Sequence, residues 1–109
     1  MELTLFIEQT VRHFSRYHRN QLGADLRRLS RELTLLIMQA NFASEKVVVI
    51  TKLRDKSEEM KLLIVLAKEV KAFVSFSQFQ QAAQLAQQIS RQSQGWLNSR
   101  QRQRPESSQ

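Results

Sequence analysis

The stretch LGADLRRLSRELTLLIMQAN, residues 22–41, has the clearest periodicity in the chain. Its apolar residues recur at alternating steps of four and three, and Ile37 widens the stripe that they form. This spacing is typical of an amphipathic helix with one narrow face toward a bundle core. The residues of this stripe are Leu22, Leu26, Leu29, Leu33, Leu36 and Ala40.

Three residues predict how this helix begins and ends. Asn20 is placed to cap the start, and Asn41 stands where a left-handed residue would end the helix. Gly23 falls in the first turn, where glycine costs up to about 1 kcal/mol relative to alanine. A close backbone contact or a tight entry from the preceding loop would explain the glycine.

Three further helices follow from the same periodicity on either side. The first is predicted over residues 3–17, with a break at residues 18–20. The third begins near Ser44 and continues through Val74, and the fourth starts after residues 75–77. Because the connections are short, neighbouring helices should be antiparallel. The predicted fold is all-α, an antiparallel up-and-down four-helix bundle over residues 1–98. Residues 99–109 are polar and basic and are predicted to form a disordered tail.

Composition limits the classes of function. The 109 residues include 17 Lys and Arg against ten Asp and Glu, which gives a net charge of +7. Such an excess favours nucleic acid or an acidic protein as partner, although it can also serve solubility alone. There is no cysteine, and the longest apolar stretch, residues 62–67, is too short for a membrane span. No signal peptide is apparent, so we expect a cytoplasmic protein that does not bind membranes.

No set of residues suggests catalysis. His13 and His18 lie five residues apart and therefore on different helix faces, which argues against a metal site. Glu58 and Glu59 are adjacent and point in different directions, so they do not make an acid–base pair. No phosphate-binding or nucleophile motif is present. We expect a protein that is not an enzyme and has no cofactor.

The basic residues form groups. One group recurs at four and three near the end of the first helix, and a second lies at the start of the next helix, away from the leucine stripe. If the two helices are antiparallel, the groups lie near the same end and could hold phosphates, without reading base sequence. The two groups are Arg12, Arg16 and Arg19, and Arg27, Arg28 and Arg31. A third line, on the third helix, includes Lys61 and Lys68, and Arg100, Arg102 and Arg104 follow in the tail.

The second half of the third helix is apolar over an unusually wide arc. Such an arc exceeds what one bundle core needs, and a second subunit would cover it. The predicted subunit interface includes Leu62, Val65 and Leu66. Trp96 either fills the end of the core or anchors the same interface.

Three stretches of this chain resemble the Avd (accessory variability determinant) proteins of diversity-generating retroelements. They are RNQLGAD at 19–25, LLIVLAKE at 62–69 and ISRQSQGWL at 89–97, and the resemblance covers residues 14–98. Val65 stands where that family often has arginine, and Gln94 where it usually has glycine.

The resemblance implies a four-helix bundle that assembles into a homopentamer with a basic exterior. It also implies binding to a reverse transcriptase and its template RNA or cDNA, in support of mutagenic retrohoming. Two alternatives remain open from the residues. One is a purely structural oligomeric four-helix scaffold, and the other is a protein of the ribosomal-RNA intervening-sequence type.

Overall fold

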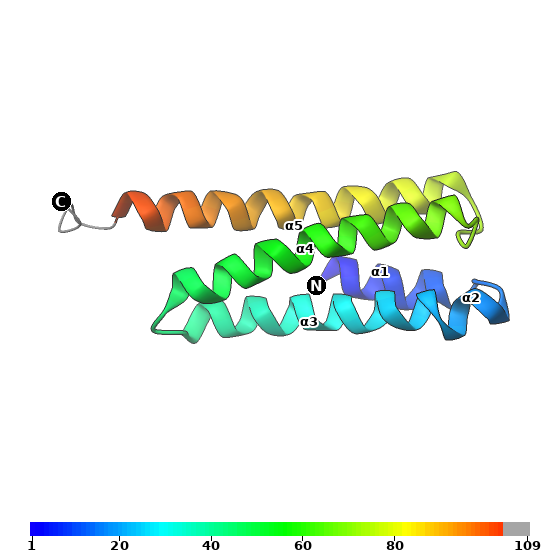
Figure 1. Cartoon of the computed structure of the whole chain (residues 1–109), viewed down its shortest axis with the longest axis horizontal. Coiled ribbons are helices and arrows are strands. Elements are labelled where there is room, and N and C mark those ends of the chain that lie inside the picture. Colours follow the sequence, from blue (N-terminus) through cyan, green and yellow to red (C-terminus); the bar gives the residue numbers. More distant parts are fainter. Residues whose placement is uncertain (104–109) are drawn as a thin grey trace.

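The computed structural model describes residues 1–103, and these form five helices (Figure 1). The fold is all-helical, as the periodicity predicts, and residues 104–109 lie outside the described part. The helices are α1 (Glu2–Val11), α2 (Arg16–Asn20), α3 (Leu22–Phe42), α4 (Lys46–Glu69) and α5 (Phe76–Gln103).

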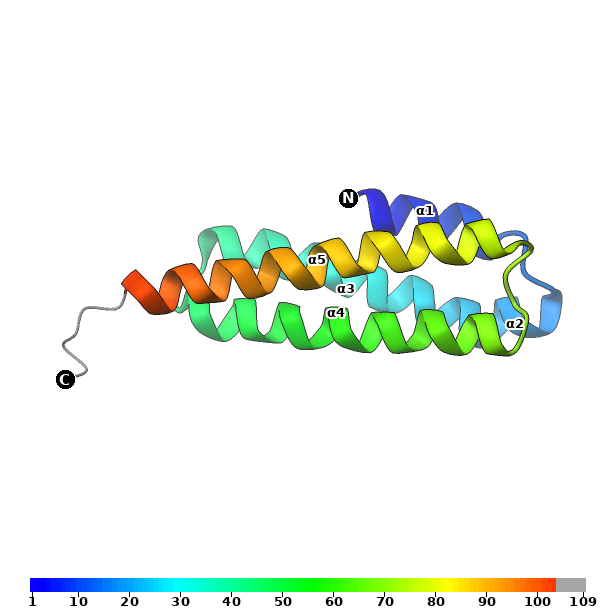
Figure 2. The same ribbon diagram turned by 90° about the horizontal axis from the view of Figure 1, so that it is seen from above.

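The three long helices run back and forth beside one another, and α1 lies next to two of them (Figures 1 and 2). Helix α4 packs against both α3 and α5, while α1 packs against α3 and α5. The short α2 contacts α3. The result is an elongated molecule of 54 × 21 × 18 Å.

The leucine stripe of α3 forms the centre of the core, as its spacing predicts. Leu26, Leu29 and Leu33 are fully buried, and they pack in one cluster with Ile7 from α1 and Ile64 from α4. The expected close contact of Gly23 is also present. A Cβ atom at this position would lie 2.6 Å from Cγ1 of Val11 and 3.2 Å from the carbonyl oxygen of His18.

The first predicted helix is wrong in its length, because α1 ends at Val11 and the break falls at residues 12–15. The turn places Phe14 in the core, where its ring packs edge-on against Phe73 at 5.4 Å. The chain then re-enters a helix with Ser15 as its cap, and the Ser15 side chain accepts a hydrogen bond from the His18 N–H. Burial of one large ring therefore takes precedence over helix continuity.

The predicted asparagine caps of α3 are also wrong. Asn20 belongs to α2, and Asn41 lies inside α3. The last carbonyl groups of α3 are instead hydrogen-bonded from outside the helix. Nζ of Lys46 donates to the carbonyl oxygens of Ala40 at 2.8 Å and Asn41 at 3.2 Å. A cation at this position also compensates the helix dipole.

Helix α4 ends at Glu69 and not at Val74, in a Schellman motif. Ala72 N–H donates to the carbonyl of Ala67, and Lys71 N–H donates to that of Lys68. This motif needs one left-handed residue, which is Lys71 with φ of 60°.

Helix α5 begins with Ser75 accepting a hydrogen bond from the Gln78 N–H. It then continues from Ser99 through Gln103, where the sequence predicts a disordered tail. That part of the prediction is wrong, and the rest of the predicted tail lies beyond the described residues. Figure 1 shows the end of α5 extending past the turn between α3 and α4.

Candidate nucleic-acid interface

The first arginine group stands at the junction of α1 and α2. Arg12 is the C-terminal cap of α1, and Arg16 opens α2. Nη1 of Arg19 donates to the carbonyl oxygen of Arg12 at 3.4 Å. Within residues 1–103, none of these three arginines forms an ion pair, so their charges are uncompensated. Arg12 and Arg16 are exposed, and Arg19 is partly buried.

The second group lies on α3, and its charges are compensated. Glu8 of α1 binds two of its members: Arg27 at 2.9 Å and Arg31 at 2.6 Å. Arg28 pairs with Glu32 at 2.7 Å along α3. The six arginines therefore divide into three with uncompensated charge and three whose charge is paired, of which Arg27 and Arg31 hold α1 against α3.

The two lysines of α4 in the predicted third line, Lys61 and Lys68, also have partners. Lys61 pairs with Glu58 at 3.0 Å, and Lys68 pairs with Glu69 at 3.2 Å. Nζ of Lys68 lies 5.1 Å from the centre of the Phe79 ring, so this charge is further engaged in a cation–π contact. Whether any of these basic residues binds nucleic acid stays a prediction.

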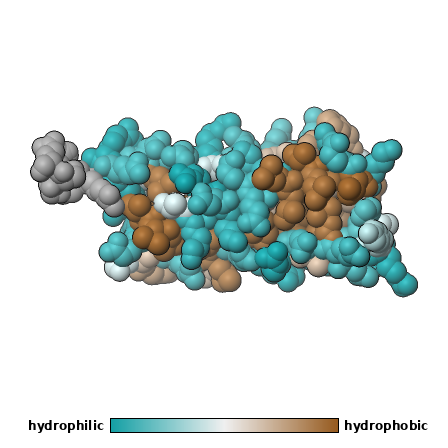
Figure 3. Space-filling model, viewed as in Figure 1, coloured by the Kyte–Doolittle hydropathy of each residue, from teal (hydrophilic) through white to brown (hydrophobic). Residues whose placement is uncertain are grey.

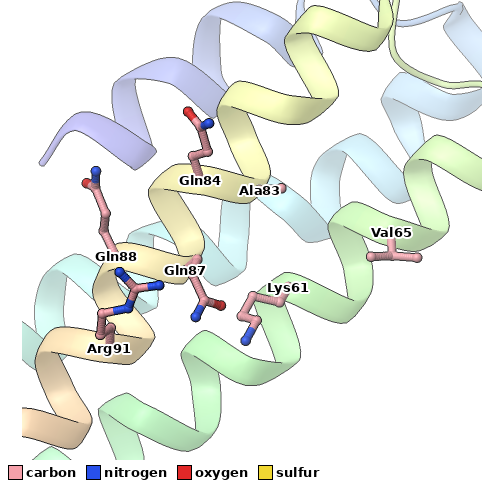
Figure 4. Close-up of a pocket in the computed structure, with 7 residues that line it drawn as sticks. All are labelled: Lys61, Val65, Ala83, Gln84, Gln87, Gln88 and Arg91. Atoms are coloured by element: carbon pink, nitrogen blue, oxygen red, sulfur yellow. The ribbon is translucent and has the colours of Figure 1, made fainter.

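A shallow groove between α4 and α5 is lined in part by an arginine, Arg91, that the sequence analysis did not predict as a site residue. This cavity of about 440 Å³ is lined by Lys61 and Val65 from α4 and by glutamines of α5 (Figure 4). Arg91 completes it from α5. Arg91 has no basic neighbour at helical spacing, so only the register of α5 against α4 brings it near Lys61.

Glu58 is held as a charged group beside this groove. The Ser90 hydroxyl donates to its carboxylate, and Lys61 donates to the same oxygen. These two hydrogen bonds hold the pKa of Glu58 below its usual value. The carboxylate therefore acts as a fixed negative charge at neutral pH.

The apolar arc of α4 lies at the surface of the single chain. Leu62, Val65 and Leu66 are 72%, 45% and 48% exposed. Figure 3 shows a continuous apolar surface over this half of the molecule. Trp96 lies elsewhere, half-buried against a small cluster that includes Ile50 and Leu97, which supports its interpretation as a residue at the end of the core.

Among the described residues, no three His, Asp or Glu side chains are grouped as a metal site would require. None of the described helices combines the length and the apolar character that crossing a bilayer requires. No family model, curated protein or solved structure matches the chain.

Proposed function

We propose that this chain is a non-catalytic accessory protein of a diversity-generating retroelement, which binds the reverse transcriptase and template RNA or cDNA through its basic surface. The observation that carries the nucleic-acid part is the uncompensated charge of Arg12, Arg16 and Arg19. An excess of exposed guanidinium groups at one place attracts phosphates and binds them bidentately.

The proposal includes the finer architecture. Helix α1, continued by α2, serves as the first member of an antiparallel four-helix bundle, and α3, α4 and α5 are the others. The exposed apolar arc of α4 is the proposed contact between copies in a homo-oligomer, and a pentamer is the number that the Avd resemblance implies. An obligate interface of this kind is rich in apolar residues.

The reverse transcriptase part rests on the three resembling stretches. Residues 19–25 form the junction of α2 and α3, where Gly23 permits close packing, and residues 62–69 contain the apolar arc. A reverse transcriptase gene and a template repeat beside the coding sequence would support this part. A coding sequence with neither nearby would contradict it.

Fluorescence anisotropy with labelled RNA and DNA, at several salt concentrations, tests the nucleic-acid part. The variant Arg12→Ala/Arg16→Ala/Arg19→Ala should bind more weakly to all sequences alike. Each lost phosphate contact should reduce the slope of log K against log salt by roughly 0.7–0.9.

A matched control removes the same number of charges elsewhere, from the first half of α4: Lys52→Ala/Arg54→Ala/Lys56→Ala. Both variants have the same net charge, so a difference between them reports on position and not on total charge. Equal binding by the two variants would contradict the assignment of the interface to Arg12, Arg16 and Arg19. If the unmodified protein shows no salt-dependent binding at all, the alternative of a purely structural scaffold takes its place.

A further inference from the structure

The end of the molecule that carries α2 also carries exposed aromatic rings. We call it the α2 end, and it comprises residues 12–20 and residues 70–79, which both views place together (Figures 1 and 2). Tyr17 is 63% exposed, and Phe76 is 61% exposed. Each ring is supported by one neighbour, Tyr17 by His18 at 5.2 Å and Phe76 by Phe79 at 5.4 Å.

One buried ring and two partly buried rings connect the two segments of the α2 end. Phe14, from the turn before α2, packs on Phe73 at 5.4 Å, and Phe73 packs on Phe79 at 6.1 Å. Because these contacts tie the turn between α1 and α2 to the start of α5, the exposed rings stand on a rigid base. Both exposed rings therefore stand on segments that pack against each other.

The charges at this end are mostly positive. Arg12, Arg16 and Arg19 are joined here by Lys71, which is also exposed and forms no ion pair within the described residues. The acid nearest in sequence to Lys71 is Glu69, which pairs with Lys68. Cations and exposed aromatic rings are thus found at the same end of the molecule.

Lys71 occupies a position that favours glycine. Its φ of 60° is sterically unfavourable for a residue with a Cβ atom, and glycine is the usual residue at this point of a Schellman motif. The lysine brings a charge to the α2 end and lowers stability in doing so. A residue that is unfavourable for the fold suggests a role outside the fold.

We infer that the α2 end binds single-stranded nucleic acid, with phosphates on the cations and bases stacked on Tyr17 and Phe76. Bases in a duplex are already stacked on one another and cannot reach these rings, whereas single-stranded bases can. The inference rests on the proposed nucleic-acid binding. It adds that the bound nucleic acid is single-stranded and that its bases contact the two rings.

Anisotropy with a single-stranded RNA and a duplex of the same length tests this. Tyr17→Ala/Phe76→Ala should weaken single-strand binding by about tenfold or more and leave duplex binding within about twofold, since stacking acts on the single strand alone. Phe42→Ala, which removes an exposed ring from the far end, is the control and should change neither.

The outcomes separate this inference from the proposed function. Equal losses for both strand forms, or no loss for either, would overturn the inference while the salt-dependent binding remains. A change of molecular mass in light scattering instead of a change in affinity would also overturn it, because the rings would then contact another subunit.

Lys71→Gly provides a second test, in which stability and affinity should change in opposite directions. The glycine should raise the midpoint of denaturant unfolding and lower the single-strand salt slope by roughly 0.7. Lys52→Ala removes one charge from α4, outside the α2 end, and should leave the slope unchanged. An unchanged slope for Lys71→Gly would remove Lys71 from the proposed site and overturn the explanation of its strained backbone.

Discussion

Two glycines in helices illustrate how one residue type can have opposite effects. Gly23 has no room for a methyl group, because Cγ1 of Val11 and the His18 carbonyl occupy the space. Gly95 lies inside α5, and no atom packs within 4 Å of the position that a Cβ atom would take there. Gly23→Ala should therefore destabilise the fold by about 1–3 kcal/mol through overpacking. Gly95→Ala should stabilise it by about 0.5–1 kcal/mol through helix propensity.

Denaturant titration of both variants checks this pair. The sequence indicated a close contact at Gly23, because a glycine in a first helical turn needs a reason. It did not indicate that the space around Gly95 is open, since that depends on what packs against α5. A stabilising Gly23→Ala would show that Val11 moves aside at little cost.

The pKa of Glu58 offers a prediction about pH. Its folded value is lowered, chiefly by the Ser90 hydroxyl and then by Lys61. A lowered folded pKa adds stability above the unfolded pKa, and this stability is lost as pH falls through the folded pKa. Ser90→Ala should raise the pKa of Glu58 toward its ordinary value, as measured by NMR titration of the carboxyl group.

The same variant has a second signature. The variant should have a lower free energy of unfolding than the unmodified protein at neutral pH, because the interaction of Ser90 with Glu58 is lost. This difference should shrink once the pH is below both the folded and the unfolded pKa of Glu58. A deficit of constant size across this range would mean that the Ser90 hydroxyl acts through packing alone.

At the scale of elements, apolar spacing predicted the long helices but not how they end. The stripe of α3 was readable because each residue in it meets the core. The break after Val11 could not be predicted, because it depends on packing of the Phe14 ring against Phe73. This contact joins distant parts of the chain, and local helix propensity carries no information about it. The end of α3 was misplaced for a related reason, because Lys46 caps it from outside the helix.

Two leucines of α3 allow a matched test of the predicted stripe. Leu33 is fully buried, while Leu35 lies two residues away and is largely exposed. Leu33→Ala should cost about 2–5 kcal/mol of unfolding free energy through lost burial and a cavity. Leu35→Ala should cost less than about 0.5 kcal/mol, as surface changes do. Similar costs in urea unfolding would contradict the assignment of the stripe to the core.

For the molecule as a whole, the charges could be read from the sequence but their pairing could not. Arg27 and Arg31 have no acidic residue at helical spacing, and only the packing of α1 on α3 brings Glu8 between them. Arg91 was not predicted for a similar reason. It lines the same groove as Lys61 only because of the register in which α5 packs against α4. The group at Arg12 was predicted from helical spacing, but the break at residues 12–15 separates Arg12 from Arg16, and the role of the group stays a prediction.

The apolar arc of α4 leads to a prediction about assembly. Val65→Glu places a charge in the proposed contact and should dissociate the oligomer while helix content in circular dichroism stays largely intact. Val48→Glu is the control, since Val48 is also exposed on α4 but lies outside the arc. Light scattering gives the mass of each variant.

A single chain has a mass of 12.8 kDa, which defines the outcomes. That mass for the unmodified protein at micromolar concentration would contradict the oligomer. Any multiple other than five would contradict only the pentamer. Dissociation by both variants alike would mean that the contact is not confined to the arc.

The length of the molecule affects how it moves through solvent. Its radius of gyration is 15.7 Å, against about 13 Å for a compact chain of this size, because α4 and α5 extend along one axis. A rod of these proportions experiences more friction than a sphere of equal mass, so one chain would leave a gel-filtration column early. Its rotation is slower end over end than about the long axis, and most helical N–H bonds lie along that axis. Nuclear spin relaxation should therefore report a longer tumbling time for the helices than the mass of one chain alone would give.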